Sequence, residues 1–432
     1  MRLAVFTNEF PTRVSTFFAR DIRGLIDAGI DVEVFAIYPL TTSLWSYVPD
    51  LLNEHILPKK KVHHLTVTEC FQSAKFWPQA NLRLFLRKAL TINAEALKFG
   101  PQTFLKSGYV SMKSSIWARR YPAGFDHILA YWGNYTATCA NLFWSATGSS
   151  VPFSIFLHAG IDLYQNQVYL PQKLLDADNI ITCSEFNRSF IKQLYFNTWD
   201  NLEDKIFVHH HGLDFSSLPF NPTDRPSRKV IAVGSLEQYK GFDYLVRAVA
   251  ELKARGTECE LQFIGDGKER SNLEKLVTDL KLSDRVTFRG WLGPDAIPNA
   301  MTQATMLVHP SPDLGDGVPN VIKESMAVGT PVIASRVAGI PELLGDGKYG
   351  VLVPPKDVKA LADAIENLLE NHSKREQYVN AARNHAKKQF DLWRQGKLLA
   401  DRLHSTTRSK PIDVNGCDRN QQGRKADEIA IT

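Results

Sequence analysis

Two acidic residues eight positions apart stand out in the segment His309–Ser335, which reads HPSPDLGDGVPNVIKESMAVGTPVIAS. Asp316 lies in a loop rich in Gly, Asp and Pro, and Glu324 lies in the helix that we expect after this loop. The glycines on either side of Asp316 have no Cβ, so a ligand can approach the backbone closely. We expect Pro319 at the first helical position, where its missing N–H costs nothing.

The start of this expected helix suits a phosphate group, because its first backbone N–H groups have no partner within the helix and the dipole makes this end positive. Carboxylates beside it can accept hydrogen bonds from sugar hydroxyls. The combination suits a nucleotide sugar. The alternative, which the loop alone leaves open, is that Asp316 and Glu324 are solvated charges favoured by the helix dipole. The expected donor contacts in this segment are Gly317, Val318, Pro319, Asn320, Val321 and Glu324.

Strands and helices alternate along two stretches of the chain, and this alternation predicts an α/β protein with two doubly wound, Rossmann-like domains. Pro219, Pro222 and Pro226 separate the two stretches. Ligands bind at the carboxyl ends of the strands in such sheets, so we expect the site in a cleft that the two sheets face. We expect an N-terminal acceptor-side domain over 1–218, a C-terminal nucleotide-sugar-binding domain over 219–390, a helix over 391–404 that returns to the first domain, and a disordered tail over 405–432.

The composition is that of an ordinary globular protein, with 44% apolar residues and a net charge of +5 over 432 residues. The five cysteines are odd in number, and no pair has metal-site or redox spacing, which favours a reducing compartment. The opening MRLAVFTNEFP has too short an apolar core for a signal peptide, and no run approaches the roughly 20 apolar residues of a membrane span. We therefore expect a cytoplasmic protein.

The segment from Asn81 to Arg120 is strongly basic, with eight Lys or Arg residues against one acid, Glu95. One interpretation is a solvated face on packed helices. The functional interpretation is peripheral docking on the anionic inner face of a membrane, where each basic residue contributes ~1 kcal/mol. Such docking would suit an enzyme with a lipid-linked acceptor.

The chain resembles the retaining glycosyltransferases of family 4, which have the GT-B fold, over most of its length and most strongly from Ile231 to Asn371. The signature of that family is Glu-x7-Glu before an A-x-G-x-P-V-[IV]-A strand. Here Asp316, seven residues, Glu324 and AVGTPVIAS match it, with a first acid shorter by one methylene. The opening FPTRVSTFFARDIRGL resembles that of exopolysaccharide and colanic-acid members.

Further segments extend the resemblance. VGSLEQYKGFDYLVRA resembles the phosphate-binding turn, with Lys240 at the position of the phosphate-binding lysine and Ser235 where many members carry Arg. FSIFLHAGIDLY resembles the H-A-x-D motif, in which His158 would contact the donor sugar, and VTFRGWL resembles the segment that holds the nucleobase. The resemblance implies catalytic roles for His158, Asp316 and Lys240, and donor contacts from Gly234, Ser235, Lys240, Gly290 and Trp291.

The activity that this resemblance implies is retaining, metal-independent transfer of a hexosyl-type sugar from a UDP- or GDP-sugar to an acceptor hydroxyl, in the biosynthesis of cell-surface polysaccharide. The implied partners are the nucleotide-sugar donor and a lipid-linked or saccharide acceptor, with no cofactor and no nucleic acid. Two alternatives remain open: a nucleotide-sugar epimerase, and a nucleotide-sugar-binding subunit without activity.

Three other motifs carry weaker signals. DAD at 176–178 matches a metal-binding Asp-x-Asp, but it precedes a strand, which favours a helix-to-strand connection. Consecutive strand residues point to opposite faces, so the three histidines at 209–211 cannot easily share one ion. GDG at 265–267 lacks the third glycine of a dinucleotide fingerprint, because Arg270 takes its place.

Overall fold

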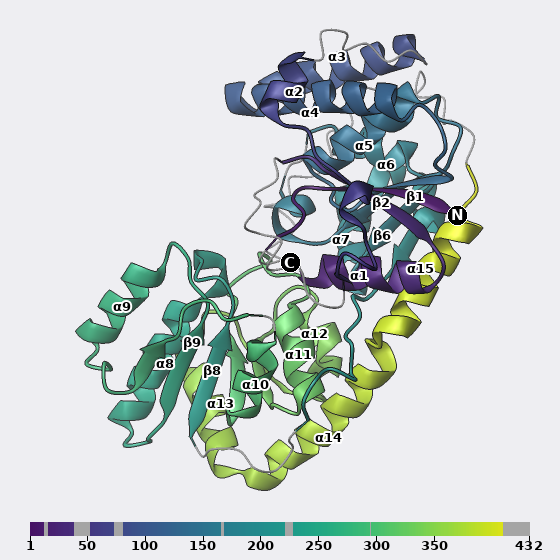
Figure 1. Ribbon diagram of the computed structural model, residues 1–432. Helices are drawn as coiled ribbons and strands as arrows, with labels where there is room; N and C mark the ends of the chain where they lie inside the picture. The colour runs from purple at the N-terminus through teal and green to yellow at the C-terminus, as the bar shows by residue number, and fades with distance from the viewer. Residues whose placement is uncertain are drawn as a thin grey trace. The chain divides into compact units, whose positions relative to one another are not determined.

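The computed structural model describes residues 1–12, 16–38, 52–72, 81–165, 168–220, 228–293 and 295–408 (Figure 1). Two of the separating prolines, Pro222 and Pro226, and most of the expected tail therefore lie outside the described residues. The chain forms two compact units: an N-terminal domain made of Met1–His210 and Trp393–Thr432, and a C-terminal domain made of His211–Leu392.

The first domain boundary lies eight residues before the expected one at 218, for a structural reason. The backbone N–H of Leu213 donates to the Phe390 carbonyl over 2.6 Å, and the N–H of Leu392 donates to the Leu213 carbonyl over 3.0 Å. A Cβ on Gly212 would lie 2.5 Å from the Leu392 Cα, so only glycine fits there. Residues 212 and 213 are therefore bound into the C-terminal domain.

The N-terminal domain has a seven-stranded, fully parallel sheet in the order β3-β2-β1-β4-β5-β6-β7. Its central strands are almost entirely apolar and buried, as expected for a sheet covered on both faces. The strands are β1 (Arg2–Thr7), β2 (Asp31–Ala36), β3 (Val62–His63), β4 (His127–Ala130), β5 (Phe153–Leu157), β6 (Asn179–Thr182) and β7 (Ile206–Val208).

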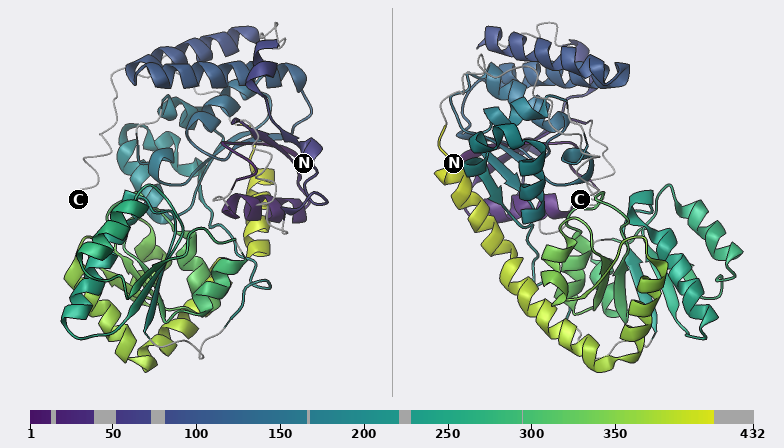
Figure 2. Two further views of the ribbon diagram at one scale, coloured as in Figure 1. Left: turned by 60° about the vertical axis from the view of Figure 1, so that its left-hand side comes forward. Right: turned by 180° about the vertical axis from the view of Figure 1, so that it is seen from behind.

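Helices cover both faces of this sheet, and two of them form a hairpin at the edge of the domain: α3 and α4, side by side in Figures 1 and 2. This hairpin packs on α5. The helices are α1 (Thr16–Asp27), α2 (Val67–Gln72), α3 (Leu82–Lys98), α4 (Pro101–Arg120), α5 (Tyr135–Ala146), α6 (Leu170–Asp176), α7 (Glu185–Leu194) and α15 (Leu392–Ser405).

Helix α15 carries the chain from the C-terminal domain back into the N-terminal domain, where it packs against α1. A Cβ on Gly396 would lie 2.5 Å from the Gly24 Cα, so a pair of glycines permits this close approach. The Arg402 side chain donates to Asn179 Oδ1 over 2.8 Å, which joins the helix to the start of β6.

The C-terminal domain has a six-stranded parallel sheet in the order β10-β9-β8-β11-β12-β13. The strands are β8 (Lys229–Val233), β9 (Glu260–Ile264), β10 (Val286–Phe288), β11 (Met306–His309), β12 (Val332–Ser335) and β13 (Val351–Val353). The helices are α8 (Phe242–Ala254), α9 (Arg270–Asp279), α10 (Ala296–Thr302), α11 (Asn320–Val328), α12 (Ile340–Leu343), α13 (Val358–Glu370) and α14 (His372–Gln389).

Helical periodicity explains how this sheet is covered. In α8 the buried residues Leu245, Val249 and Leu252 recur at helical spacing and join one apolar cluster with the strand residues Val230 and Phe263. The fold is therefore α/β with two doubly wound domains, as the alternation of elements predicted. Among the described residues, none of the helices combines the length and hydropathy of a membrane span.

Candidate active site

The carboxyl edge of the C-terminal sheet has one topological switch point, between β8 and β11. From β8 the chain continues outward to β9 and β10, whereas β11 leads to β12 and β13 on the other side. Ligands of open α/β sheets bind where the strand order reverses. The loops after β8 and β11 are the ones that carry the residues singled out in the sequence.

Four polar side chains meet at the switch point, three from these two loops and one, His309, from the end of β11, with the Asp316 carboxylate at their centre. The Lys240 ammonium donates to Asp316 Oδ2 over 2.5 Å. His309 Nε2 lies 2.7 Å from the same oxygen, and the Ser311 hydroxyl lies 3.1 Å from His309 Nε2. Lys240 and Asp316 are 76 positions apart, so the fold alone brings them together.

Charge and burial define the protonation states in this cluster. Burial by itself would raise the pKa of the Asp316 carboxyl, but the Lys240 ammonium and His309 outweigh it and keep this pKa well below its usual range. Burial lowers the pKa of His309, which Asp316 only partly offsets. At neutral pH the Asp316 carboxyl is therefore ionised and the His309 imidazole is neutral.

Close packing between the two loops fixes the position of Lys240 relative to Asp316. Lys240 ends a short 3-10 helix, Gln238–Lys240, and Gly241 follows it with φ of 66°. A Cβ on Gly241 would lie 2.3 Å from the Pro310 carbonyl oxygen, and one on Gly315 would lie 2.8 Å from the Tyr239 Cβ. Both glycines are needed because backbone and side chain of the opposite loop occupy the space where a Cβ would stand.

Helix α11 begins at Asn320, one residue later than the sequence predicted. Pro319 is the N-cap with ψ of 121°, an extended value, so the expectation that it is the first helical residue was wrong. The first N–H groups of the helix are then those of Asn320 and Val321. Glu324 lies one turn after Asn320 on the same face, and both are partly exposed.

The loop before α11 is also hydrogen-bonded to the segment that follows β12. The Gly339 N–H donates to the Gly317 carbonyl over 3.0 Å. Gly317 and Pro319 are buried, whereas Val318 between them is partly exposed. A continuous strip of sequence-predicted residues thus leads from Asp316 to the start of the helix: Gly317, Val318, Pro319, Asn320 and Val321.

The ends of β8, β9 and β10 lie side by side, and backbone hydrogen bonds at glycines join the residues that follow them. The Gly234 N–H donates to the Ile264 carbonyl over 2.9 Å, and the Gly265 N–H donates to the Gly290 carbonyl over 2.8 Å. A Cβ on Gly265 would lie 1.9 Å from the Gly234 carbonyl oxygen. Backbone therefore lines this part of the sheet edge.

Three sequence-predicted residues lie along this glycine-lined edge. Gly234 lies beside Lys240, because a Cβ built on Gly234 would be in ordinary van der Waals contact with Lys240 Cε at 3.5 Å. The Ser235 hydroxyl lies 3.3 Å from the Tyr239 hydroxyl. Trp291, which follows Gly290, is 49% exposed, which leaves its ring available to a planar ligand.

In the N-terminal domain, His158 follows β5 and is buried among aromatic rings. Its ring stacks on Phe156, with centroids 4.3 Å apart, and lies 4.5 Å from the ring of Trp132. Its backbone N–H donates to Asp162 Oδ2 over 2.9 Å, and its Nδ1 lies 3.4 Å from the same oxygen. His158 is therefore held by the acid four residues later.

Asp162 connects two strand ends of this domain. Its Oδ2 accepts a hydrogen bond from the backbone N–H of His158, which follows β5. Its Oδ1 accepts hydrogen bonds from the backbone N–H groups of Gly133 and Asn134, which follow β4. Lys173 binds the other side of the same turn: its ammonium donates to the Gly133 carbonyl over 2.9 Å and to the Asn134 carbonyl over 3.3 Å. Burial lowers the pKa of Lys173 to about 7.

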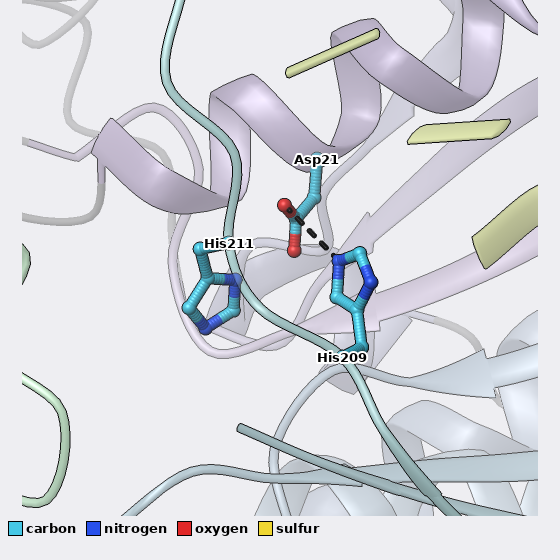
Figure 3. A group of neighbouring side chains, drawn as sticks. All are labelled: Asp21, His209 and His211. Atoms are coloured by element: carbon cyan, nitrogen blue, oxygen red, sulfur yellow. Dashed lines mark ion pairs between the residues drawn. The ribbon is translucent and has the colours of Figure 1, made fainter. Parts of the chain in front are cut away.

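The remaining motifs have structural contacts. Asp176 accepts from Lys88 over 2.5 Å and Asp178 from Arg408 over 2.7 Å, at the turn between α6 and β6. His209 Nε2 lies 3.6 Å from Asp21 Oδ1, both buried in the N-terminal domain (Figure 3). His211, which Figure 3 also labels, is the first residue of the C-terminal domain.

Sequence reasoning missed His309, Ser311, Asp162 and Lys173 as members of these networks. His309 ends strand β11 and Asp162 lies within the quoted HAGIDLY motif. The rule that strand ends carry the site could have found both. Lys173 had no signal, because a buried lysine in a short helix looks like a surface lysine in the sequence.

Comparison with known proteins shows which family the C-terminal domain resembles. The sequence model of the family "Glycosyl transferases group 1" matches residues 218–385, which span the loops after β8 and β11 and helix α11. This part of the chain is similar to the group 1 glycosyltransferases. The match covers most of the C-terminal domain, in which the Lys240–Asp316 pair lies.

Curated relatives extend the similarity beyond this domain. The amylovoran biosynthesis glycosyltransferase AmsK of Erwinia amylovora is 26% identical over 93% of this chain and all of its own length. The putative colanic acid biosynthesis glycosyltransferase WcaL of Salmonella typhimurium is also 26% identical, over 94% of this chain and all of its own. An α-D-kanosaminyltransferase of Streptomyces kanamyceticus is 36% identical, but over only 41% of this chain and 45% of that protein.

Solved structures share the whole fold of this chain. Anabaena HepE in complex with UDP and glucose matches with a TM-score of 0.68 and 20% identity, over 94% of this chain and all of HepE. A sucrose-phosphate synthase of Thermosynechococcus elongatus matches with a TM-score of 0.66 and 20% identity, over 94% of this chain and 98% of its own. Both matches cover the two domains, so the chain has the GT-B fold.

Proposed function

We propose that this glycosyltransferase moves a sugar from a nucleoside diphosphate sugar to an acceptor hydroxyl, with retention of the anomeric configuration and without a metal ion. The observation that carries the proposal is the Lys240–Asp316 ion pair at the switch point, immediately before the N-terminus of α11. A cation and a helix N-terminus suit a diphosphate, and a partly buried carboxylate beside them suits sugar hydroxyls.

In this proposal the C-terminal domain binds the donor. Negative charge grows on the diphosphate as the bond to the sugar breaks, and Lys240 together with the first N–H groups of α11 stabilises that charge. Glu324, one turn along the helix, accepts from the ribose hydroxyls, and Asp316 accepts from the sugar hydroxyls. Backbone near Gly290 and the exposed ring of Trp291 hold the nucleobase.

The transfer step needs no protein nucleophile in this scheme. The acceptor oxygen bonds to the anomeric carbon on the face that the diphosphate leaves, and the acceptor proton passes to the departing phosphate oxygen. Because Lys240 and the helix end supply the positive charge, a divalent cation is not required for leaving-group departure. The family resemblance also assigns His158 a contact with the donor sugar, and Asp162 holds that ring in place.

Names of relatives support a polysaccharide context and a uridine donor. AmsK and WcaL carry names from amylovoran and colanic acid biosynthesis, and HepE was solved with UDP and glucose. We therefore propose a saccharide acceptor in the assembly of a surface polysaccharide, and a UDP-sugar as the first donor to test, with GDP-sugars second.

Thermal shift with UDP-, GDP- and ADP-sugars, followed by product analysis with the cognate donor, tests the proposal. We expect one nucleotide class to raise the melting temperature, and NMR of the product to show the anomeric configuration of the donor. Rates should be equal with and without EDTA. An isomerised donor would indicate an epimerase, and stabilisation without nucleoside diphosphate release a binding subunit. An inverted product or full inhibition by EDTA would overturn the mechanism.

A further inference from the structure

The outer face of the α3–α4 hairpin in the N-terminal domain has the chemistry of a membrane-docking surface. Thirteen large apolar side chains are exposed in the described part of the chain, and six of them lie within the 24 positions from Leu82 to Leu105. We call this face, together with its basic residues, the hairpin surface. Its apolar members are Leu82, Leu90, Leu97, Phe99, Phe104 and Leu105.

Helix α3 has an apolar stripe on each of two faces, although a surface helix ordinarily needs one. Phe85, Ile92 and Ala96 are buried and recur at helical spacing, so they form the stripe that packs on the domain. Leu90 and Leu97, seven positions apart on another face, are 70% and 57% exposed. Within the described structure this second stripe has no packing role.

The turn between the helices concentrates the exposed apolar groups. Phe99 is 44% exposed, and on the first turns of α4 Phe104 is 37% and Leu105 69% exposed. Lys98 and Lys106 flank this tip, and both are exposed. Apolar side chains at a protruding tip with lysines at its rim can enter the headgroup region while the lysines remain beside the phosphates.

The charge of the hairpin surface has one sign. Arg83 and Arg87 continue the exposed face of α3 that carries Leu90 and Leu97. The one acid of the segment, Glu95, is partly buried and accepts the backbone N–H of Tyr169 over 2.7 Å. The surface thus presents four exposed cations, Arg83, Arg87, Lys98 and Lys106, and no exposed carboxylate.

We infer that the hairpin surface docks this enzyme on a bilayer containing anionic lipids. A second copy of the chain is disfavoured as the occupant, because two such surfaces would bring four cations against four cations without an acid to pair them. Nucleic acid is disfavoured because four of the six exposed apolar side chains are leucines, on which bases cannot stack. Anionic headgroups above an apolar interior complement both the cations and the leucines.

Membrane docking is independent of the proposed transfer reaction, since it concerns a surface of the N-terminal domain and is measured without donor. If both hold, the enzyme works where a lipid-linked saccharide acceptor is found. A failure of docking would leave the catalytic proposal intact, and the reverse is also true.

Vesicle sedimentation of the full-length protein tests this inference. The vesicles consist of phosphatidylcholine with or without 30% phosphatidylglycerol, an assay condition of roughly physiological anionic content. We expect binding to the anionic vesicles only, weakened by salt. Arg83→Gln with Arg87→Gln should lower the partition coefficient about 25-fold, since ~1 kcal/mol per basic residue is about fivefold each. Leu97→Ser with Leu105→Ser should lower it at least tenfold, from the lost apolar insertion.

Matched controls make the result specific. Phe196→Ser removes another exposed apolar side chain of the same domain, and Lys359→Gln removes an exposed cation of the C-terminal domain. Both should bind vesicles as the wild type does, and circular dichroism should show every variant folded. Equal binding of wild type and hairpin variants, or no binding to anionic vesicles, would overturn the inference. So would a dimer in sedimentation velocity that the leucine variant dissociates.

Discussion

The Lys240 ammonium and the Asp316 carboxylate form an ion pair of 2.5 Å between the loops that follow two adjacent parallel strands. In the proposed function, a diphosphate at the N-terminus of α11 would compete with Asp316 for this ammonium. The pair therefore links the strength of donor binding to the position of the carboxylate that we assign to the sugar.

Lys240→Ala should lower kcat/KM by a factor of 100 to 1,000, since removal of one preorganised charge-stabilising donor costs ~3 kcal/mol or more. The loss arises because no other cation lies beside the leaving diphosphate in our proposal. Steady-state kinetics with the cognate donor measure it. Lys268→Ala, an exposed lysine in the loop after β9, is the control and should keep wild-type activity. A normal rate for Lys240→Ala would remove the assignment.

Asp316→Asn should separate binding from catalysis. Without the carboxylate the Lys240 ammonium is no longer neutralised, so affinity for the nucleoside diphosphate should rise by roughly three- to tenfold, as expected for a partly buried charge. Transfer should slow at least tenfold because the sugar loses a charged acceptor. Isothermal titration with UDP and turnover assays give the two values. Parallel loss of binding and turnover would instead show that the pair only maintains the fold.

Glu324→Gln should weaken nucleotide binding about 10- to 100-fold, the equivalent of a hydrogen bond to a charged group at ~1.5–3 kcal/mol. The effect should disappear for a donor analogue that lacks the ribose 2′- and 3′-hydroxyls. Glu370→Gln, at the exposed end of α13, serves as the matched control. If the deoxy analogue showed the same ratio between wild type and variant, Glu324 would not bind the ribose.

Asp162 should affect catalysis by orienting the His158 imidazole. Asp162→Asn removes the charge that orients the imidazole and should lower kcat by about tenfold with little change in KM, a split that a purely structural role would not produce. Asp162→Ala should also destabilise the domain, because the N–H groups of Gly133, Asn134 and His158 lose their acceptor at ~1–3 kcal/mol each. Asp126→Asn, an exposed acid bonded to the Arg2 N–H, should change neither quantity.

His127 should make the N-terminal domain sensitive to acid. Burial lowers the pKa of this histidine to about 4, with Asp178 opposing and His404 reinforcing the shift. The folded pKa is depressed, so the unfolded chain takes up the proton first. The stabilising contribution is present above pH 6.5 and is lost as pH falls toward 4, by ~3 kcal/mol in total. Urea unfolding from pH 7 to 4 measures it.

The His127 prediction has an internal control. His372, exposed on α14, has no comparable burial, so His372→Gln should leave the pH dependence unchanged. His127→Gln should flatten the curve between pH 6.5 and 4, since the neutral amide can replace the hydrogen bond to Ser154 Oγ. A wild-type slope in His127→Gln would assign the acid sensitivity to other groups.

Much of the fold can be predicted from local sequence patterns. Apolar strands such as KVIAV and RLAVF alternate with amphipathic helices, and this alternation predicted two doubly wound domains. The exception is the region from Tyr38 to Pro122, whose sequence shows no clear alternation of strands and helices although it contains α2, α3 and α4. The cause is visible in α4, whose buried face includes Ser107, Ser111, Ser114 and Ser115, so the apolar period is hidden.

The residue types and spacing of the donor loop were likewise determined by the sequence: an acid among glycines, a helix start and a second acid on that helix. Only the tertiary structure decided which groups meet. Lys240 reaches Asp316 because β8 and β11 are neighbours in the sheet, and His309 joins them because β11 ends at the same edge. Contacts between residues 76 positions apart depend on strand order, which local propensity does not encode.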